Sequence, residues 1–272
     1  MSRVAVFGGS LFTRADRSAN PAAPWIVLSN SLAADHAMWA PQMAALTPHF
    51  HVLRYDTRGH GASDIPPGPY NFDDLVGDIV AILDHHRIEK VTFLGLSLGG
   101  MTGLGLALNY PERLTGLICC DARADAPPTF VTSWLERIAA IERGGMTAIA
   151  QGTIERWFGP AFRAAQPDTV AAIAATIRAT PVAGYKGCAA ALMGLDYLKR
   201  LHTVRTPSLF VAGADDAAAP PEVMRDMAGR VPGAAFTVIP KASHLANVEN
   251  APDFNSAILG FLTRTLANSI PA

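Results

Sequence analysis

One apolar run that ends in a glycine-flanked serine constrains the fold of this chain more than any other feature. Val91 to Leu96 is strand-like and rich in apolar residues, and the motif Gly95-Leu96-Ser97-Leu98-Gly99 closes it without a break. A helical pattern of small residues follows directly. Strand, sharp turn and helix in this order are the context of a nucleophile elbow, in which a strained turn exposes a serine and leaves room only for glycine at its flanks.

The same stretch admits two other interpretations, and its residues disfavour both. The spacing from Gly95 to Thr102 resembles a phosphate-binding loop, but such a loop needs lysine where Met101 stands. Val91 to Tyr110 is 20 residues long and carries no charge, which is the length of a membrane-spanning helix. Its five glycines and its change from strand-like to helical periodicity favour a buried strand followed by a core helix.

The composition excludes several other classes of protein. The chain has 272 residues, of which 50% are hydrophobic and 17% charged, so it is long and apolar enough for one large globular core. Its net charge is -1 without blocks of like charge, so we expect no binding to nucleic acid or to membranes. Three cysteines form neither a disulfide framework nor a metal-binding spacing. The first residues lack a long apolar segment, so we expect no signal peptide and a cytoplasmic location.

Strand-like and helical segments alternate along most of the chain, which is typical of a parallel sheet with helices on both faces. The expected strands are residues 3–7 and 10–14, which form a hairpin, 25–29, 51–55, 91–96, 114–120, 207–212 and 234–239. The expected helices outside the cap include 36–46, 71–86 with Asn71 or Asp73 as its N-cap, 220–231 and 253–266. Between residues 129 and 200 only helical patterns occur. The sequence therefore predicts an α/β fold: a mostly parallel, doubly wound sheet from residues 1–124 and 201–272, with an inserted helical cap of residues 125–200.

An acid and a histidine follow the last two expected strands. A serine hydroxyl needs a positioned base to take its proton. In sheets of this kind the partners lie in loops at the carboxyl ends of strands, in the chain order serine, acid, histidine. Asp216 follows the strand 207–212, and His244 follows the strand 234–239. The sequence therefore predicts Ser97 as the nucleophile, His244 as the base and Asp216 as the acid that orients it.

The choice of the acid leaves alternatives open. Asp215 is adjacent to Asp216, and we expect it to cap the loop that both share. Asp121 and Asp125 follow the strand 114–120 beside the elbow, a place from which an acid could also reach the histidine. The remaining histidines are expected to be structural: His60 lies in a glycine-flanked loop, and the others have no acid in register, namely His36, His49, His85, His86 and His202.

Acyl transfer also needs two N–H donors that stabilise the negative charge developing on the carbonyl oxygen. The backbone N–H of Leu98 is one candidate, because it belongs to the residue that follows the nucleophile. The loop after an early strand supplies the second donor in this architecture, and here that loop is Asn30-Ser31-Leu32. We therefore expect the N–H groups of Leu32 and Leu98 to form the oxyanion hole.

With these pieces placed, nearly the whole chain resembles the α/β-hydrolase superfamily, and more narrowly the 3-oxoadipate enol-lactonases of aromatic degradation. The segments that carry the resemblance are Leu28-Ser29-Asn30-Ser31-Leu32, Met38-Trp39, residues 55–63, Pro66-Pro67-Gly68-Pro69-Tyr70, residues 95–103 and residues 214–221. The family's triad falls on Ser97, Asp216 and His244. Three places depart from the family's pattern: Ala33-Ala34 stands for Gly-Thr, Leu98 for Met, and residues 121–128 for a cap that begins Asn-Thr-Ala-Ala-Arg.

The resemblance implies a serine hydrolase that cleaves a small ester or lactone through an acyl-enzyme, with no metal or organic cofactor. An anionic substrate would need a cation, for which Arg123 at the sheet-to-cap junction is the candidate, unless it pairs with Asp121 or Asp125. Trp134 either lines the pocket or packs as an ordinary helix residue. Two alternatives remain: a carboxylesterase or perhydrolase for small neutral esters, and a non-catalytic binding protein on the same scaffold.

Overall fold

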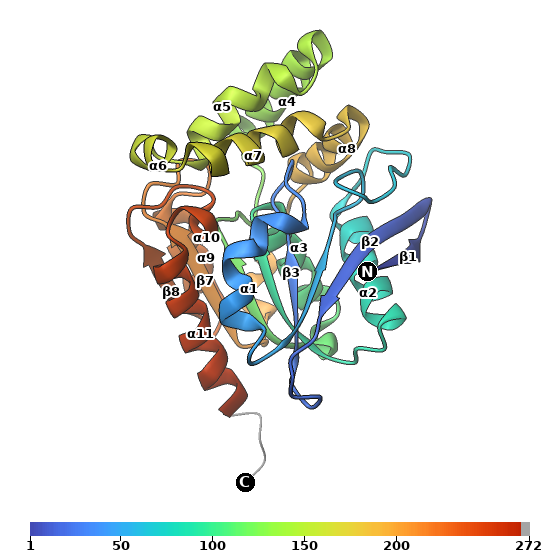
Figure 1. The fold of residues 1–272 in the computed structure, drawn as a ribbon, viewed down its shortest axis with the longest axis vertical. Coiled ribbons are helices and arrows are strands. Elements are labelled where there is room, and N and C mark those ends of the chain that lie inside the picture. Colours follow the sequence, from blue (N-terminus) through green and yellow to red (C-terminus); the bar gives the residue numbers. More distant parts are fainter. Residues whose placement is uncertain (268–272) are drawn as a thin grey trace.

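A single twisted sheet forms the centre of the molecule in the computed structural model, which describes residues 1–267 (Figure 1). Within these residues the sheet has eight strands, in the order β1-β2-β4-β3-β5-β6-β7-β8. The strands are β1 (Ser2–Val6), β2 (Gly9–Asp16), β3 (Trp25–Ser29), β4 (His51–Tyr55), β5 (Val91–Leu96), β6 (Leu114–Cys120), β7 (Ser208–Gly213) and β8 (Ala235–Ile239).

Strands β3 to β8 are parallel to one another, whereas β1 and β2 form an antiparallel hairpin at one edge, and β2 runs antiparallel to β4. The predicted mostly parallel sheet is therefore confirmed. In the register of β3 and β5, Ser29 lies opposite Gly95. Because both strands end there, the loop that starts at Asn30 lies beside the turn that holds Ser97.

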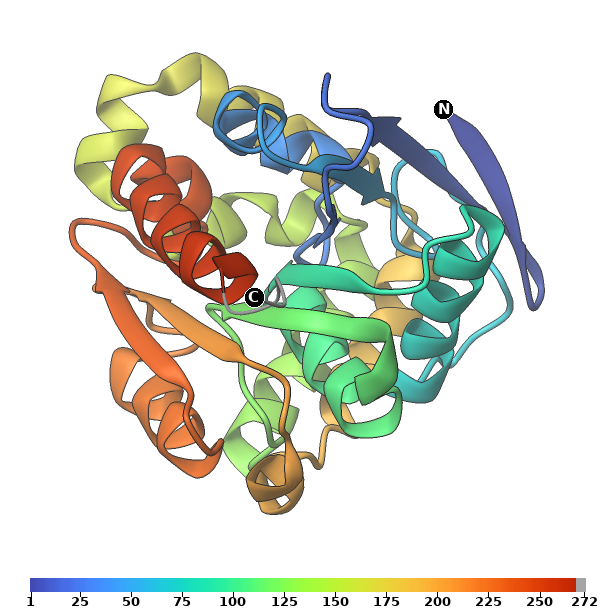
Figure 2. The same ribbon diagram turned by 90° about the horizontal axis from the view of Figure 1, so that it is seen from below.

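Helices cover both faces of the sheet, as Figures 1 and 2 show. Helices α1 (Ala40–Leu46) and α11 (Ala251–Ala267) lie on one face, and α2 (Phe72–His85), α3 (Leu98–Asn109) and α9 (Pro221–Arg230) lie on the other. Short helical turns complete the core: η1 (His36–Trp39), η2 (Pro111–Arg113), η3 (Leu198–Thr203) and α10 (Ala246–Glu249). No helix within residues 1–267 is long and apolar enough to span a membrane, and residues 91–110 contain β5 and α3.

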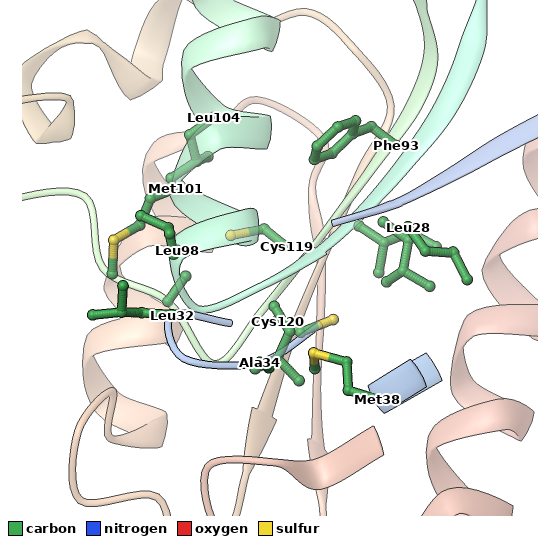
Figure 3. Packing of buried hydrophobic residues seen from close by; sticks show 14 of the residues in the cluster. Leu28, Leu32, Ala34, Met38, Phe93, Leu98, Met101, Leu104, Cys119 and Cys120 are labelled. Atoms are coloured by element: carbon green, nitrogen blue, oxygen red, sulfur yellow. The ribbon is translucent and has the colours of Figure 1, made fainter. Parts of the chain in front are cut away.

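Helix α3 packs unusually closely on the sheet because it carries glycines where larger residues would collide. A Cβ atom on Gly103 would lie 2.8 Å from side-chain atoms of Leu117 and Phe93 in the strands below. The apolar side chains of this helix, among them Leu98, Met101 and Leu104, are buried and are labelled in Figure 3. Close packing fixes the start of α3, and Ser97 stands directly before it.

Five helices between β6 and β7 lie over one end of the sheet (Figure 1), and they end near the glycines and prolines that the sequence places between them. They are α4 (Pro128–Gly144), α5 (Thr147–Trp157), α6 (Pro160–Ala165), α7 (Pro167–Ala179) and α8 (Val182–Met193). Gly145, between α4 and α5, has a φ of 64°, which glycine adopts at little cost. We call these helices the cap.

The structure corrects several predicted boundaries. The expected helix 36–46 begins as the 3-10 turn η1, and the closing helix begins at Ala251, two residues early, after the unpredicted short helix α10. Strand β2 continues to Asp16, into a stretch that had been expected to be a loop. Asn71 is the N-cap of α2, and its side chain and that of Asp74 each accept a hydrogen bond from the other's backbone N–H.

Candidate active site

The turn between β5 and α3 has the strained geometry of a nucleophile elbow. Ser97 has φ 57° and ψ -118°, a conformation that a residue with a side chain adopts only where its surroundings enforce it. The N–H of Ser97 donates to the Cys120 carbonyl at 2.8 Å, which fixes the turn to strand β6. A Cβ atom on Gly95 would lie 2.2 Å from the Gly99 carbonyl oxygen, so the turn excludes any larger residue there. Ser97 itself is not fully buried.

The structure brings Ser97, His244 and Asp216 into one hydrogen-bonded chain. The Nε2 atom of His244 lies 3.0 Å from the Ser97 hydroxyl oxygen, and its Nδ1 atom lies 2.8 Å from a carboxylate oxygen of Asp216. With Nδ1 protonated toward the carboxylate, Nε2 is free to accept the serine proton. Asp216 is 3% exposed and His244 is 6% exposed, so bulk water does not compete for the bond between them.

The environment of Asp216 keeps it ionised. Burial alone would raise the pKa of this carboxyl, but the facing His244 and backbone N–H groups of the same loop outweigh it and hold the pKa below its usual value. One of these groups is the N–H of Ala218, which donates to Asp216 at 2.7 Å. An ionised, immobile carboxylate can fix the orientation of an imidazole and stabilise its protonated form.

The other candidate acids lie elsewhere. Asp215 is exposed, and the expectation that it caps the loop is wrong, because Asp216 itself accepts the hydrogen bond from Ala218. In such a turn the side chain that accepts the hydrogen bond belongs to the residue two positions before the donor, and two positions before Ala218 is Asp216. Asp125 lies 3.4 Å from Arg123 in an ion pair. One expectation about the histidines also fails: His36 does face an acid, with its Nδ1 atom 2.8 Å from Asp56.

Asp121 is a buried carboxyl beside the triad but not a member of it. Its side chain is 0% exposed, and one of its oxygens accepts the Gly213 N–H at 2.6 Å while the other has no hydrogen-bond partner among the described residues. Burial, and then the nearby charge of Asp216, raise the pKa of Asp121 well above its usual value. The φ of 46° at this position suits aspartate or asparagine, which tolerate the left-handed region better than most residues.

The two backbone groups expected to form the oxyanion hole have no acceptor of their own within residues 1–267. The N–H groups of Leu32 and Leu98 take part in none of the hydrogen bonds of this region, whereas the next N–H group, that of Gly99, donates to the Asn30 carbonyl at 3.0 Å. Leu32 and Ser97 both line the cavity described below. Free N–H groups at such a place can stabilise a developing oxyanion.

A cavity of about 340 Å³ lies between the sheet and the cap, with Ser97 and His244 at its base. The predicted binding residues Arg123 and Trp134 both line it. Arg123 also keeps a 3.4 Å contact with Asp125 and lies over the Phe130 ring, so the expected ion pair is present, whereas its role toward an anionic substrate stays a prediction. The ring of Trp134 packs against Phe130 and Tyr185, with ring centroids 5.8 and 6.1 Å apart.

Two further arginines of the cap line the same cavity, and the sequence reasoning missed both of them. Arg137 in α4 lies over the Trp134 ring, 4.5 Å from its centroid, and Arg156 in α5 donates to the Thr153 hydroxyl at 3.1 Å. Burial, and then the charge of Arg137, lower the pKa of Arg156, because the two cations repel each other. A possible signal was the spacing of Trp134 and Arg137, three residues apart on one helix face.

The arrangement is electrostatically one-sided. Among the lining residues, all within the described part of the chain, three are arginines and one, Asp121, is an acid whose pKa burial raises well above its usual value. A cavity lined by three guanidinium groups and a serine suits a small molecule that has both a carboxylate and a carbonyl carbon open to attack.

Comparisons with known proteins agree with this geometry. The model of the family described as the alpha/beta hydrolase fold matches residues 24–251. The chain is 35% identical to 3-oxoadipate enol-lactonase 2 of Acinetobacter baylyi over 253 residues, which cover 93% of this chain and 91% of that protein. The crystal structure of the enol-lactonase from Burkholderia xenovorans has a TM-score of 0.92 at 38% identity, with 96% of this chain and 100% of that chain covered. A thermophilic esterase from Thermogutta terrifontis has a TM-score of 0.90 at 28% identity, with coverage of 97% and 98%.

Proposed function

Because the chain belongs to the α/β-hydrolase family, we propose that it is a serine hydrolase that opens a small lactone or cleaves a small ester through an acyl-enzyme. The observation that carries the proposal is the hydrogen-bonded chain from Ser97 through His244 to Asp216 at the base of an arginine-lined cavity. A non-catalytic binding protein would not need an activated serine at a strained turn.

The proposed reaction has two halves. His244 takes the Ser97 proton as the serine oxygen bonds to the substrate carbonyl carbon, and the N–H groups of Leu32 and Leu98 stabilise the oxyanion. The bond from the carbonyl carbon to the ring or ester oxygen then breaks, and the proton on His244 passes to the leaving oxygen. In the second half His244 takes a proton from water, the resulting hydroxide attacks the acyl carbon, and Ser97 leaves with its proton restored.

The proposed substrate is a lactone that carries a carboxylate, most specifically a 3-oxoadipate enol-lactone. Arg123, Arg137 and Arg156 around the cavity support an anionic substrate, and the similarity to two enol-lactonases supports the ring-opening reaction. An enol leaving group suits this site, since the released enol relaxes to a ketone. No metal or organic cofactor takes part in these steps.

We also propose a cytoplasmic location and a place in aromatic degradation. The division into core and cap at residues 125 and 200, predicted from the sequence, is proposed as well.

A second candidate is a carboxylesterase for small neutral esters. It is supported by the similarity to a thermophilic esterase and by the apolar side chains that also line the cavity, among them Met101, Phe130 and Leu192. The two candidates share the triad and differ in what the arginines do: an anion needs them, whereas a neutral ester does not.

Both candidates can be tested together. Opening of 3-oxoadipate enol-lactone and hydrolysis of p-nitrophenyl butyrate should be measured with the wild type, Ser97→Ala and Arg137→Met. For the lactonase we expect kcat/KM of at least about 10⁴ M⁻¹s⁻¹ in the wild type, abolished by Ser97→Ala and reduced about 10-fold or more by Arg137→Met through KM. Hydrolysis of p-nitrophenyl butyrate at the same rate in the wild type and in Arg137→Met supports the esterase. Activity that survives Ser97→Ala refutes the proposed function.

A further inference from the structure

One carboxylate joins the loop of the catalytic histidine to the cap. We infer that Glu249, in the short helix α10, is a positioning residue that holds His244 in register with the cap, an inference that rests on the proposed function. One oxygen of Glu249 accepts the N–H of Ser243, the residue before His244, at 2.6 Å. Its other oxygen accepts the N–H of Gly159, at the junction of α5 and α6 in the cap, also at 2.6 Å.

These two hydrogen bonds are short and charge-assisted, so they are stronger than bonds between neutral groups. Glu249 is partly buried, and no ion pair engages it within residues 1–267. The two backbone N–H groups are therefore the partners that stabilise its charge. We call Glu249 with the N–H groups of Ser243 and Gly159 the clamp.

A second hydrogen bond connects the loop of His244 to the cap, on the other side of the histidine. The N–H of Leu245 donates to the Trp157 carbonyl of α5 at 3.2 Å. The residues on both sides of His244 are thus connected to residues 157–159 of the cap. Leu245 is connected by its own hydrogen bond, and Ser243 is connected through the Glu249 side chain. Trp157 lines the cavity, so a shift of this segment changes the substrate pocket and the position of the base together.

The triad tolerates only small displacements of His244. His244 has to remain within hydrogen-bond reach of Ser97 and Asp216 at once, at the observed 3.0 and 2.8 Å. A displacement of about 1 Å can lower a reaction rate about 100-fold. Without the clamp the N–H of Ser243 loses its hydrogen-bond acceptor. The loop that carries His244 can then move relative to Ser97.

The geometry at Gly159 offers a matched pair of variants that cut the clamp from the cap side. Gly159 has φ -64° and ψ 158°, and Phe158 before it is extended, so the backbone here has the angles that proline requires, although the proline ring would displace the Glu249 carboxylate that faces the N–H. Gly159→Pro removes the N–H donor, whereas Gly159→Ala keeps it. Both add a Cβ atom at the same place, 3.0 Å from the Glu249 oxygen, and only proline also replaces the N–H by a carbon, so a difference between them reports on the contact between Glu249 and the backbone at position 159.

The test measures the activation of Ser97 directly, with a small neutral fluorophosphonate. Its phosphorus bonds to the Ser97 oxygen, fluoride leaves, and the serine proton goes to His244, so the rate reports on the triad rather than on the anion-binding arginines. The rate constant of labelling is compared among the full-length wild type, Glu249→Ala, Glu249→Gln and the two Gly159 variants. Glu136→Gln, which removes an exposed carboxylate from cap helix α4, is the control for charge. The melting temperature is recorded for each protein.

We expect Glu249→Ala to slow labelling about 10- to 100-fold. Glu249→Gln should lie between it and the wild type, because its amide oxygen still accepts one N–H. Gly159→Pro should be at least about fivefold slower than Gly159→Ala, and it should add nothing in the Glu249→Ala background, because both changes remove one coupled interaction. Glu136→Gln should label at the wild-type rate.

The inference is overturned if folded Glu249→Ala labels within about twofold of the wild type, or if Gly159→Pro and Gly159→Ala label alike. A merely structural role would lower the melting temperature and leave the rate per folded molecule unchanged. If Glu249→Ala does not fold, the Gly159 pair decides. A wild-type protein that is not labelled at Ser97 refutes the proposed function, which distinguishes that failure from the failure of the clamp alone.

Discussion

Replacement of Asp121 by asparagine should stabilise the protein at pH 8 and have little effect at pH 4. The carboxyl of Asp121 is fully buried, and burial followed by the charge of Asp216 raises its pKa well above the value of about 3.9 that an unfolded chain has. The folded protein therefore binds a proton at pH values at which the unfolded chain has lost it. Unfolding releases that proton, so the free energy of unfolding falls as the pH rises from about 4 toward the folded-state pKa.

The magnitude follows from the same comparison. Each unit by which the folded-state pKa exceeds the unfolded one removes about 1.4 kcal/mol of stability at high pH. Asparagine is isosteric and uncharged, and its oxygen can still accept the Gly213 N–H that Asp121 binds at 2.6 Å. We expect the stability that Asp121→Asn gains over the wild type to grow with pH above about 4, by up to about 1.4 kcal/mol for each pH unit until the folded-state pKa is reached, and each such step raises the melting temperature by about 3–5 °C.

The measurement is thermal unfolding of the wild type and Asp121→Asn from pH 4 to pH 9. Asp215→Asn makes the same chemical change at an exposed position of the neighbouring loop, and its curve should run parallel to that of the wild type. A constant difference between wild type and Asp121→Asn at all pH values would refute the reasoning, and so would a loss of stability at pH 8. A constant difference would mean that the pKa of Asp121 is not raised in the folded protein.

Two further predictions follow from the site. Asp216→Asn should lower kcat about 10³- to 10⁴-fold, because an amide can neither hold the required tautomer of His244 nor stabilise its charge. Asp215→Asn should leave kcat within about twofold of the wild type. Steady-state kinetics on either substrate compares the two variants, and equal losses would contradict the assignment of the acid. Ala33 has a φ of 64°, so Ala33→Gly should raise the free energy of unfolding by about 0.5–1 kcal/mol, while Ala34→Gly should lower it by a similar amount; urea unfolding gives both values, and a loss in Ala33→Gly would show that the left-handed conformation carries no strain.

The sequence by itself determined the architecture and the chain of groups at its centre. The glycine-flanked Ser97 specifies a strained turn locally, because only glycine fits around it. The alternation of segments specifies a mostly parallel sheet, and the carboxyl ends of parallel strands meet at one edge. These two rules nominated His244, and they favoured Asp216 with Asp215 left open, although the residues that the structure brings against Ser97 are more than a hundred positions away from it.

The tertiary structure decided what depends on how separate elements pack. Local pattern could not separate Asp215 from Asp216, because one residue of register in a loop changes which side chain is buried. Arg137 and Arg156 enter the cavity from two cap helices, and Glu249 accepts the N–H of Gly159 from 90 positions away. The rotation of a helix about its axis and its placement over a sheet are set by long-range packing, which no local pattern encodes. The sequence therefore predicted the proposed catalytic groups, whereas tertiary packing decided what surrounds them and holds them in place.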